Sequence, residues 1–270
     1  MKVNHDTLGA VELPDRPARI VSLAPNVTDA LFFLGYGHRV VGRSAFCWRP
    51  EAAGGLPVVA SYTKVRWDLL EELRPDLVFT TTAVQREATR ALHARGYAVW
   101  PLPLPNSPWG ILENLHTLAA FLGGVGAAAA RAAGLAARYQ ALAGMLDGLR
   151  VYLEYDLGGP VTIGRAAFMN AALAHLGAQN VFDDRAAAYF EPDLDEVPRR
   201  NPDLYLFEPR RIQNRAAQLE AVLSRLRTRN WPERPLVVTL GDELAHFGPG
   251  FFDHLELWAG EMRRAANEPA

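Results

Sequence analysis

The chain has 270 residues, of which 49% are hydrophobic and 21% are charged, and its formal net charge is −2 at neutral pH. This composition, with a mean hydropathy of −0.05, is typical of a compact folded protein and argues against a disordered chain. The basic residues are dispersed along the sequence, which argues against binding to nucleic acid or to an anionic membrane surface.

The cysteine content and the apolar runs set further limits. Cys47 is the only cysteine, so an internal disulfide and a thiolate zinc cluster are excluded, and we expect a small packed side chain. The first ten residues lack the apolar core of a signal peptide, and no apolar run approaches the roughly 20 residues of a membrane span. As written, the sequence predicts a cytoplasmic protein, and a periplasmic or cell-surface one only if a leader was removed.

The first half of the chain predicts alternating strands and helices, which is typical of a parallel sheet with helices on its faces. Residues 2–13 predict a small hairpin, and the apolar run 19–23 predicts a buried strand that leads into a helix capped by Asn26. Further strands are predicted at 39–42, 58–60, 75–80 and 97–102, and further helices at 66–73, 87–95 and 109–122.

An alanine-rich stretch, residues 125–149, lies near the centre of the chain. Alanine loses no side-chain entropy in a helix, so this stretch predicts one continuous helix of roughly 35 Å. Its larger side chains recur at spacings of four and three residues, which predicts one buried stripe. The stripe consists of Leu135, Tyr139, Leu142, Leu146 and Leu149.

The second half repeats the alternation of the first. We therefore interpret the chain as an N-terminal α/β lobe (1–123), a connecting helix (124–149) and a C-terminal α/β lobe (150–270). An ordinary surface helix of a single α/β domain is the alternative. Strands are predicted at 151–154, 161–163, 204–207 and 235–240, helices at 167–176, 195–200, 213–227 and 251–266, and a loop around Tyr189 and Phe190.

One short pattern occurs in both predicted lobes. Asp68 stands seven residues before a Pro-Asp-Leu sequence that begins at Pro75, and Asp195 stands seven residues before one that begins at Pro202. In each case an acidic residue near a helix start precedes a strand that opens with Pro-Asp-Leu. The two lobes are therefore predicted to be pseudo-symmetric, although a match this short can arise by chance.

Common enzyme motifs find no support in the sequence. The run that begins at Gly124 approximates a dinucleotide fingerprint, but that motif needs a strand before its glycines and here a helix is predicted. The seven histidines include no pair spaced i, i+4, and neither a Gly-x-Ser-x-Gly elbow nor a His-Glu-x-x-His motif occurs. No metal site and no standard hydrolase are therefore predicted.

Several segments resemble the helical-backbone substrate-binding proteins of ABC importers, and in particular their vitamin B12-binding branch, beside siderophore and haem binders. The resemblance extends from about residue 8 to residue 262. It implies an α/β fold with two Rossmann-like lobes joined by a single long α-helix, a ligand cleft between the lobes, and small domain closure, because a continuous helix cannot act as a loop hinge. The segments are residues 19–29, residues 39–42 with Cys47 and Pro50, residues 74–78, the central helix, and Gly241-Asp242 with Gly248-Pro249.

The resemblance also implies a binding site. Flat aromatic walls suit a corrin, which is a broad planar ring with an apolar face and amide edges. The aspartate near the family's last strand is kept as Asp242, whereas His246 stands where the family has an arginine, and this leaves the choice of ligand open. The cleft aromatics of the B12 binder correspond here to Phe46, Tyr62, Tyr155 and Tyr189.

The implied function is non-enzymatic binding of a cobalamin-like or other metal-chelate ligand by a monomer without a cofactor. In the B12 branch each lobe presents one surface acid to arginines of the transporter's membrane subunits, and these positions correspond to Asp68 and Asp195. Alternatively, each is only a first-turn acid that the helix dipole favours by about 0.3–1 kcal/mol.

Two other functions stay open at this point. One is a cytosolic protein that binds a corrinoid or another tetrapyrrole. The other is a tetrapyrrole metal chelatase in which Asp242, Glu243 and His246 handle metal or protons.

Overall fold

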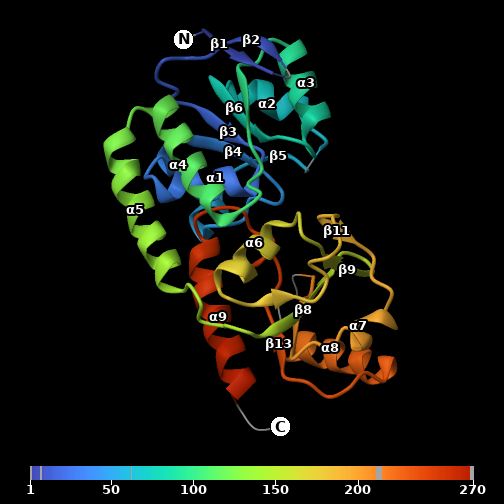
Figure 1. The fold of residues 1–270 in the computed structure, drawn as a ribbon. Coiled ribbons are helices and arrows are strands. Elements are labelled where there is room, and N and C mark those ends of the chain that lie inside the picture. Colours follow the sequence, from blue (N-terminus) through green and yellow to red (C-terminus); the bar gives the residue numbers. More distant parts are fainter. Residues whose placement is uncertain (1, 7, 62, 211–214, 268–270) are drawn as a thin grey trace. The chain divides into compact units, whose positions relative to one another are not determined.

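The computed structural model describes residues 2–6, 8–61, 63–210 and 215–267. The chain divides into two compact units, and one of the boundaries between them falls inside a helix, between Ala136 and Ala137. Each unit has its own sheet (Figure 1), so the predicted α/β class is confirmed. The N-terminal unit comprises Met1–Pro105, Trp109–Ala136 and Phe247–Gly250, and the C-terminal unit comprises Asn106–Pro108, Ala137–His246 and Phe251–Ala270.

The N-terminal unit is built on a five-stranded parallel sheet with the order β5-β4-β3-β6-β7. This order reverses between β3 and β6, as in doubly wound nucleotide-binding folds. The predicted hairpin is confirmed as β1 (Lys2–His5) and β2 (Gly9–Glu12). The strands are β3 (Ile20–Ser22), β4 (Val40–Ser44), β5 (Val58–Ala60), β6 (Leu77–Thr81) and β7 (Val99–Leu102), and the helices are α1 (Pro25–Phe33), α2 (Trp67–Leu73), α3 (Arg86–Ala94) and α4 (Pro108–Leu122), with short 3-10 turns at Gly37–Arg39 and Glu51–Ala53.

One face of this sheet forms an apolar core with α2 and α3. Val21, Val78 and Val99 occupy adjacent register positions on β3, β6 and β7 and are fully buried. Leu70 from α2 and Leu92 from α3 pack against the same cluster. The predicted cap at Asn26 is wrong: Asn26 lies inside α1, whose N-cap is Ala24, because Pro25 starts the helix earlier.

The C-terminal unit carries a mixed sheet with the order β11-β9-β8-β12-β13, in which β10 also pairs with β8. The expected parallel pairing holds for β8, β12 and β13 and is wrong for β9, which runs antiparallel to β8. Strand β10, which the sequence did not predict, is parallel to β8. A short turn joins β8 to β9, and so few residues cannot form the crossover that parallel neighbours need. The strands are β8 (Arg150–Asp156), β9 (Pro160–Ile163), β10 (Gln179–Asn180), β11 (Tyr189–Phe190), β12 (Leu204–Glu208) and β13 (Leu236–Val238), and the helices are α6 (Phe168–His175), α7 (Glu196–Arg199), α8 (Arg215–Arg229) and α9 (Phe251–Asn267).

The short sequence pattern shared by the two halves has the same local structure in each unit. In the N-terminal unit the Asp76 carboxylate accepts the backbone N–H of Arg19, and the Asp76 N–H returns a bond to the Arg19 carbonyl. In the C-terminal unit Asp203 and Arg150 exchange the same two bonds.

The residues just before the two Pro-Asp-Leu sequences are equivalent as well. Arg74 and Asn201 both adopt left-handed backbone conformations, with φ of 44° and 48°. Both observations support the predicted pseudo-symmetry.

The alanine-rich helix is shorter than predicted. Helix α5 comprises Val125–Ala141, and the predicted continuation to Leu149 is wrong. Gly144, Leu146 and Gly148 instead donate backbone N–H bonds to the carbonyls of residues 175, 176 and 177, respectively, at the end of α6. Gly144 and Gly148 adopt φ of 71° and 78°, outside the helical region. Tertiary hydrogen bonds thus replace the last two helical turns, while Leu135, Tyr139, Leu142 and Leu146 of the predicted stripe are buried.

This difference predicts opposite effects for two Gly→Ala substitutions, each at a site where an added Cβ meets nothing within 4 Å. Gly134→Ala, inside α5, should raise the free energy of unfolding by about 0.5–1 kcal/mol. Gly148→Ala should lower it by about 1–2 kcal/mol, because the left-handed conformation is strained for alanine. Chemical denaturation of both variants checks this, and stabilisation by both would contradict the observed helix end.

Candidate functional site

The switch point of the N-terminal sheet is held by a buried glutamine. In open α/β sheets ligands bind outside the carboxyl ends of the strands, where the strand order reverses. Gln85 connects these two strand ends, because its Oε1 accepts the Thr81 N–H at 2.8 Å and its Nε2 donates to the Leu23 carbonyl at 2.8 Å. The strand ends beside a prospective ligand are therefore fixed relative to each other.

The loop after β4 carries the predicted aromatic residue Phe46. Its side chain is 52% exposed, which is unusual for a phenylalanine. Its backbone N–H donates to the Ser44 hydroxyl, which also lies 3.1 Å from the sulfur of Cys47. Cys47 is a packed side chain, as predicted, and its burial raises the pKa of the thiol. The second aromatic residue predicted for this lobe, Tyr62, lies outside the described residues.

The C-terminal unit places Tyr155, Tyr189 and Glu208 together at the carboxyl ends of β8 and β12. Glu208 is the register partner of Tyr155, and the Tyr155 and Tyr189 rings meet edge to face with centroids 6.1 Å apart. Tyr155 is buried and Tyr189 is 43% exposed. Within the described part of the chain the Tyr155 hydroxyl has no hydrogen-bond partner. Burial and the nearby Glu208 raise the pKa of both phenols, that of Tyr189 to about 12.

Glu208 also holds the loop formed by residues 239–246, which we call the 239–246 loop. Its Oε2 accepts the backbone N–H groups of Glu243 at 3.1 Å and Leu244 at 2.7 Å, and its Oε1 accepts that of Ala245 at 3.1 Å. The Thr239 hydroxyl donates to Oε2 at 3.2 Å. Burial raises the pKa of Glu208 to about 7 against the opposing effect of these N–H groups, and Asp242 adds to the increase.

The two polar residues predicted for this region lie in the 239–246 loop. Asp242 is half-buried and adopts φ of 55°, a strained conformation of the kind that clusters at functional sites. His246 is buried. Glu243 stabilises the loop through a hydrogen bond within it, since the Glu243 carboxylate accepts the Leu240 N–H at 2.9 Å. The same carboxylate lies 3.6 Å from His254 Nδ1 of α9.

The structure thus brings together part of the predicted site. Tyr155, Tyr189 and the loop that carries Asp242 and His246 surround Glu208 in the C-terminal unit, whereas Phe46 belongs to the N-terminal unit. Sequence reasoning missed Glu208. The available signal was its position as the charged residue that closes the apolar strand at 204–208, at the edge where α/β sheets bind ligands.

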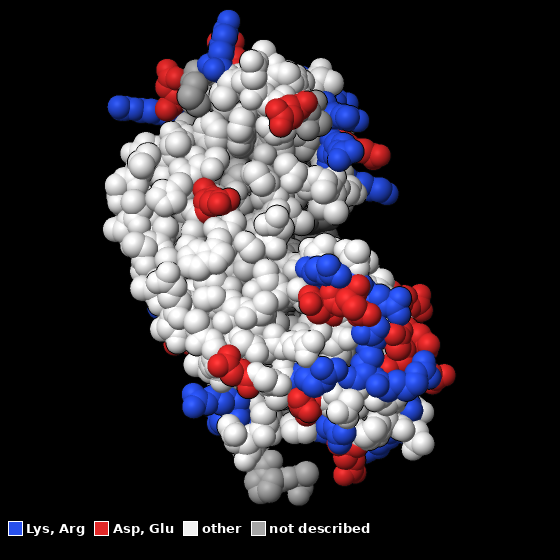
Figure 2. Space-filling model, viewed as in Figure 1, with Lys and Arg blue, Asp and Glu red and all other residues white. Residues whose placement is uncertain are grey.

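The two acids predicted to dock a transporter are exposed near helix starts. Asp68 lies in the first turn of α2, and Asp195 is the N-cap residue of α7. Figure 2 shows charges of both signs gathered over the part of the C-terminal unit that holds α7 and α8. Glu196 pairs there with Arg185 and Arg200. As far as the described residues go, neither Asp68 nor Asp195 forms an ion pair.

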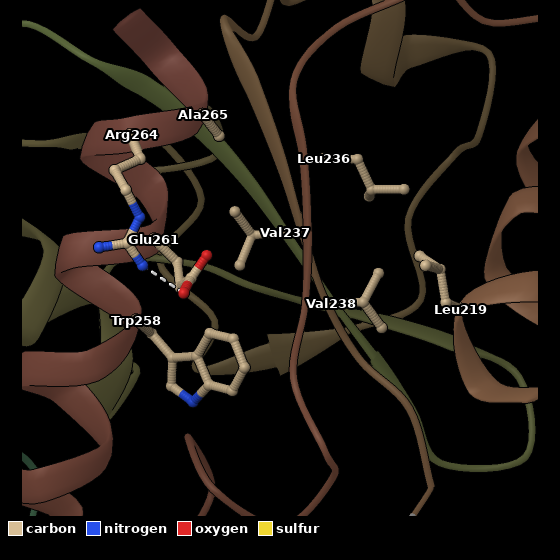
Figure 3. Close-up of a pocket in the computed structure, with 8 residues that line it drawn as sticks. All are labelled: Leu219, Leu236, Val237, Val238, Trp258, Glu261, Arg264 and Ala265. Atoms are coloured by element: carbon tan, nitrogen blue, oxygen red, sulfur yellow. Dashed lines mark hydrogen bonds and ion pairs between the residues drawn. The ribbon is translucent and has the colours of Figure 1, made fainter. Parts of the chain in front are cut away.

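A separate cavity of about 260 Å³ flanks the edge strand β13. Figure 3 shows Val237 directed toward α9 and Leu236 and Val238 directed toward Leu219 of α8. Among the described residues, the charged groups that line it are Glu261 and Arg264, and they pair with each other. None of the predicted binding residues lines this cavity, so it is distinct from the candidate site.

The described residues offer neither a cluster of metal ligands nor a membrane-spanning helix. They contain no group of three or more His, Cys, Asp or Glu side chains placed to hold a metal ion. Over the same residues no helix combines the length and the apolar character needed to cross a membrane.

The fold and the position of the site define a two-lobed α/β binding protein. The chain belongs to the family described as periplasmic binding protein, which matches residues 20–230, and this confirms the family resemblance. A cobalamin-binding protein of Halobacterium salinarum is 30% identical over 207 residues, which cover 72% of this chain and 55% of that protein. The chain therefore spans about half the length of this relative.

Solved structures share the fold. The periplasmic vitamin B12 binding protein of Vibrio cholerae matches with a TM-score of 0.73 at 19% identity, covering 94% of this chain and 100% of that one. A periplasmic haem-binding protein from Pseudomonas aeruginosa matches with a TM-score of 0.79 at 21% identity, covering 94% of this chain and 95% of that one. Neighbours with different ligands thus share one architecture.

Proposed function

We propose that this chain binds a cobalamin-like metal chelate as the substrate-binding protein of an ABC-type importer, outside the cytoplasm. The observation that carries the proposal is a pair of exposed aromatic side chains, Phe46 in one unit and Tyr189 in the other, both near strand ends where α/β sheets bind ligands. Exposed aromatic rings suit an apolar planar ligand. The family membership and the cobalamin-binding relative support the same ligand class.

The proposal assigns a role to each of the predicted binding residues. Phe46 and Tyr62 would contribute from the N-terminal unit and Tyr189 from the C-terminal unit. Tyr155 is buried behind Tyr189 and packs edge to face against it, so its role is to orient that ring. Asp242 and His246 would supply polar contacts to the edge of the ligand.

The charges at and around Glu208 favour an amide-edged ring over one that carries carboxylates. Glu208, Asp242 and Glu243 are all acidic, and the family's arginine is replaced by His246. The primary amides of a corrin donate hydrogen bonds that carboxylates accept. The propionates of haem and the acidic groups of many siderophores would instead face like charges. We therefore rank corrinoids above haem as ligands.

A ligand screen tests the proposal directly. Tryptophan fluorescence and calorimetry with cobalamin, cobinamide, haem and ferric siderophores should show saturable binding, tightest for a corrinoid. Failure of all of these ligands to bind would refute the function, and preferential haem binding would refute the argument from charge.

A second assay addresses catalysis. We incubate the protein with a divalent metal and a large molar excess of a metal-free tetrapyrrole. The tetrapyrrole should keep its metal-free absorption spectrum, because we propose that the protein binds its ligand without inserting metal. Turnover of several equivalents per protein would instead indicate a chelatase.

Tyr189→Ala should weaken binding of the corrinoid found in the screen by at least about tenfold, because loss of a buried aromatic contact typically costs about 2 kcal/mol. Tyr62→Ala should have a comparable effect. Calorimetry measures both affinities, and circular dichroism checks the fold. Leu219→Ala is the matched control, since Leu219 is a comparably exposed apolar residue on α8. Unchanged affinity in both tyrosine variants would show that the ligand binds elsewhere.

A further inference from the structure

Glu208 occupies an unusual position for a carboxylate. It is 4% exposed, and four donors from a single segment, the 239–246 loop, converge on its two oxygens. Three of these donors are consecutive backbone N–H groups, at residues 243–245. A buried carboxylate that accepts several N–H groups fixes the backbone around it. The loop conformation, including the left-handed Asp242 just before these residues, therefore depends on this carboxylate.

The protonation state of Glu208 determines how many hydrogen bonds its side chain can accept from the loop. An ionised carboxylate only accepts hydrogen bonds, whereas a protonated one carries an O–H donor on one oxygen. A proton on Oε1 would face the Ala245 N–H, and a proton on Oε2 would face three donors. Either placement sets donor against donor and releases part of the loop.

We propose that Glu208 is the positioning residue of the 239–246 loop and that high ligand affinity requires its ionised form. This inference rests on the proposed function, because Asp242 and His246 in the loop are proposed ligand contacts. It adds a regulatory property: the protein holds its ligand in neutral to alkaline solution and releases it as the solution becomes acidic.

The charged and titratable groups around Glu208 come from several elements. Tyr155 of β8 and Tyr189 of β11 are phenols whose pKa values are raised, so they stay neutral. Asp242 lies in the loop itself and Glu243 lies beside His254 of α9. Histidines are the other side chains that change charge near neutral pH, so His246 and His254 must be tested as competing causes.

The direction of the effect follows from the pKa of Glu208, which burial raises from 4.5 to about 7. Between these values the folded chain binds more protons than the unfolded chain, so the contribution of Glu208 to stability falls as the pH rises. Affinity should change in the opposite direction, because only the ionised form holds the whole loop. Weaker binding in acid would therefore not reflect unfolding caused by Glu208.

The first experiment measures cobinamide and cobalamin affinity from about pH 8 to about pH 5.5. Wild-type affinity should fall about tenfold over this range, as expected when a charge-assisted hydrogen-bond network is lost. Glu208→Gln should bind these ligands about tenfold more weakly than wild type at about pH 8, and its affinity should not change with pH. Glu220→Gln, which removes the same charge from an exposed helix position, should behave as wild type. A pH profile that disappears in His246→Gln or His254→Gln but persists in Glu208→Gln would overturn the inference.

The second experiment needs no ligand and so separates this inference from the proposed function. Amide hydrogen exchange over the 239–246 loop should be faster in Glu208→Gln than in wild type at about pH 8 and similar at about pH 5.5, after correction for intrinsic rates. As the pH falls, the loop of the wild-type protein should lose protection from exchange relative to β8, with a midpoint near pH 7. This measurement on wild type alone provides the test if the variant does not fold. Protection that is independent of pH in wild type would refute the role of Glu208, whatever the ligand screen shows.

Discussion

Arg229→Ala should lower the free energy of unfolding by about 3–5 kcal/mol, because it leaves a buried carboxylate without its cation. The Arg229 guanidinium binds Glu154 through two bonds of 2.6 and 2.9 Å, and Glu154 is 1% exposed. The Tyr152 hydroxyl donates to the same carboxylate at 2.7 Å. Glu154 lies in the middle of β8, so its charge cannot reach water without disrupting the sheet. Chemical denaturation followed by circular dichroism measures the loss.

Two further variants show whether the unpaired charge is the cause. Arg227→Ala removes a neighbouring arginine whose partner Glu220 is exposed, and such surface pairs contribute only about 0–1 kcal/mol. Replacing both buried partners, as Glu154→Leu with Arg229→Met, should recover much of the stability, since apolar residues can substitute for a buried pair. A loss in Arg229→Ala no larger than that in Arg227→Ala would contradict this account.

The sequence predicted most elements because hydrophobic periodicity and breakers report local structure. The strand at 204–207, for example, was found as β12 with one additional residue. The errors occurred where the local structure depends on contacts with other parts of the chain or on the length of a connection. Residues 142–149 have helical composition, yet the backbone N–H groups of Gly144, Leu146 and Gly148 bond to the end of α6. The antiparallel direction of β9 depends on the length of a turn, which strand patterns alone do not show.

The candidate site was accessible to sequence reasoning only in part. Phe46, Tyr155, Tyr189 and Asp242 were proposed through the family resemblance, since a single aromatic residue is more often part of a core. Tyr155 shows why: it is buried, and only the structure distinguishes it from the exposed Tyr189. The position of Glu208 at a strand end could be read from the sequence, but its role in holding the 239–246 loop could not, because its hydrogen-bond donors lie 31 to 37 positions away.

The double variant Asp68→Lys with Asp195→Lys should abolish association with the cognate transporter and leave ligand affinity unchanged. We propose that these two exposed acids, one in each unit, meet arginines on the membrane subunits, so that charge reversal would place like charges face to face. Their chain positions support equivalent roles, since the residues that follow them, Arg74-Pro75-Asp76 and Asn201-Pro202-Asp203, have matching backbone geometry in the two units. Pull-down with the transporter in detergent or nanodiscs measures association, and calorimetry measures ligand affinity.

A matched control separates docking from the helix-dipole explanation. Glu87 is an exposed first-turn acid of α3, and Glu233 is an exposed acid of the C-terminal unit. Glu87→Lys with Glu233→Lys therefore changes the net charge by the same amount at positions without a proposed docking role. If Asp68 and Asp195 were only acids favoured at helix starts, their reversal would cost about 0.3–1 kcal/mol of stability each and leave transporter binding intact. Equal loss of association in both double variants would indicate a general charge effect, whereas loss confined to Asp68→Lys with Asp195→Lys supports two specific docking contacts.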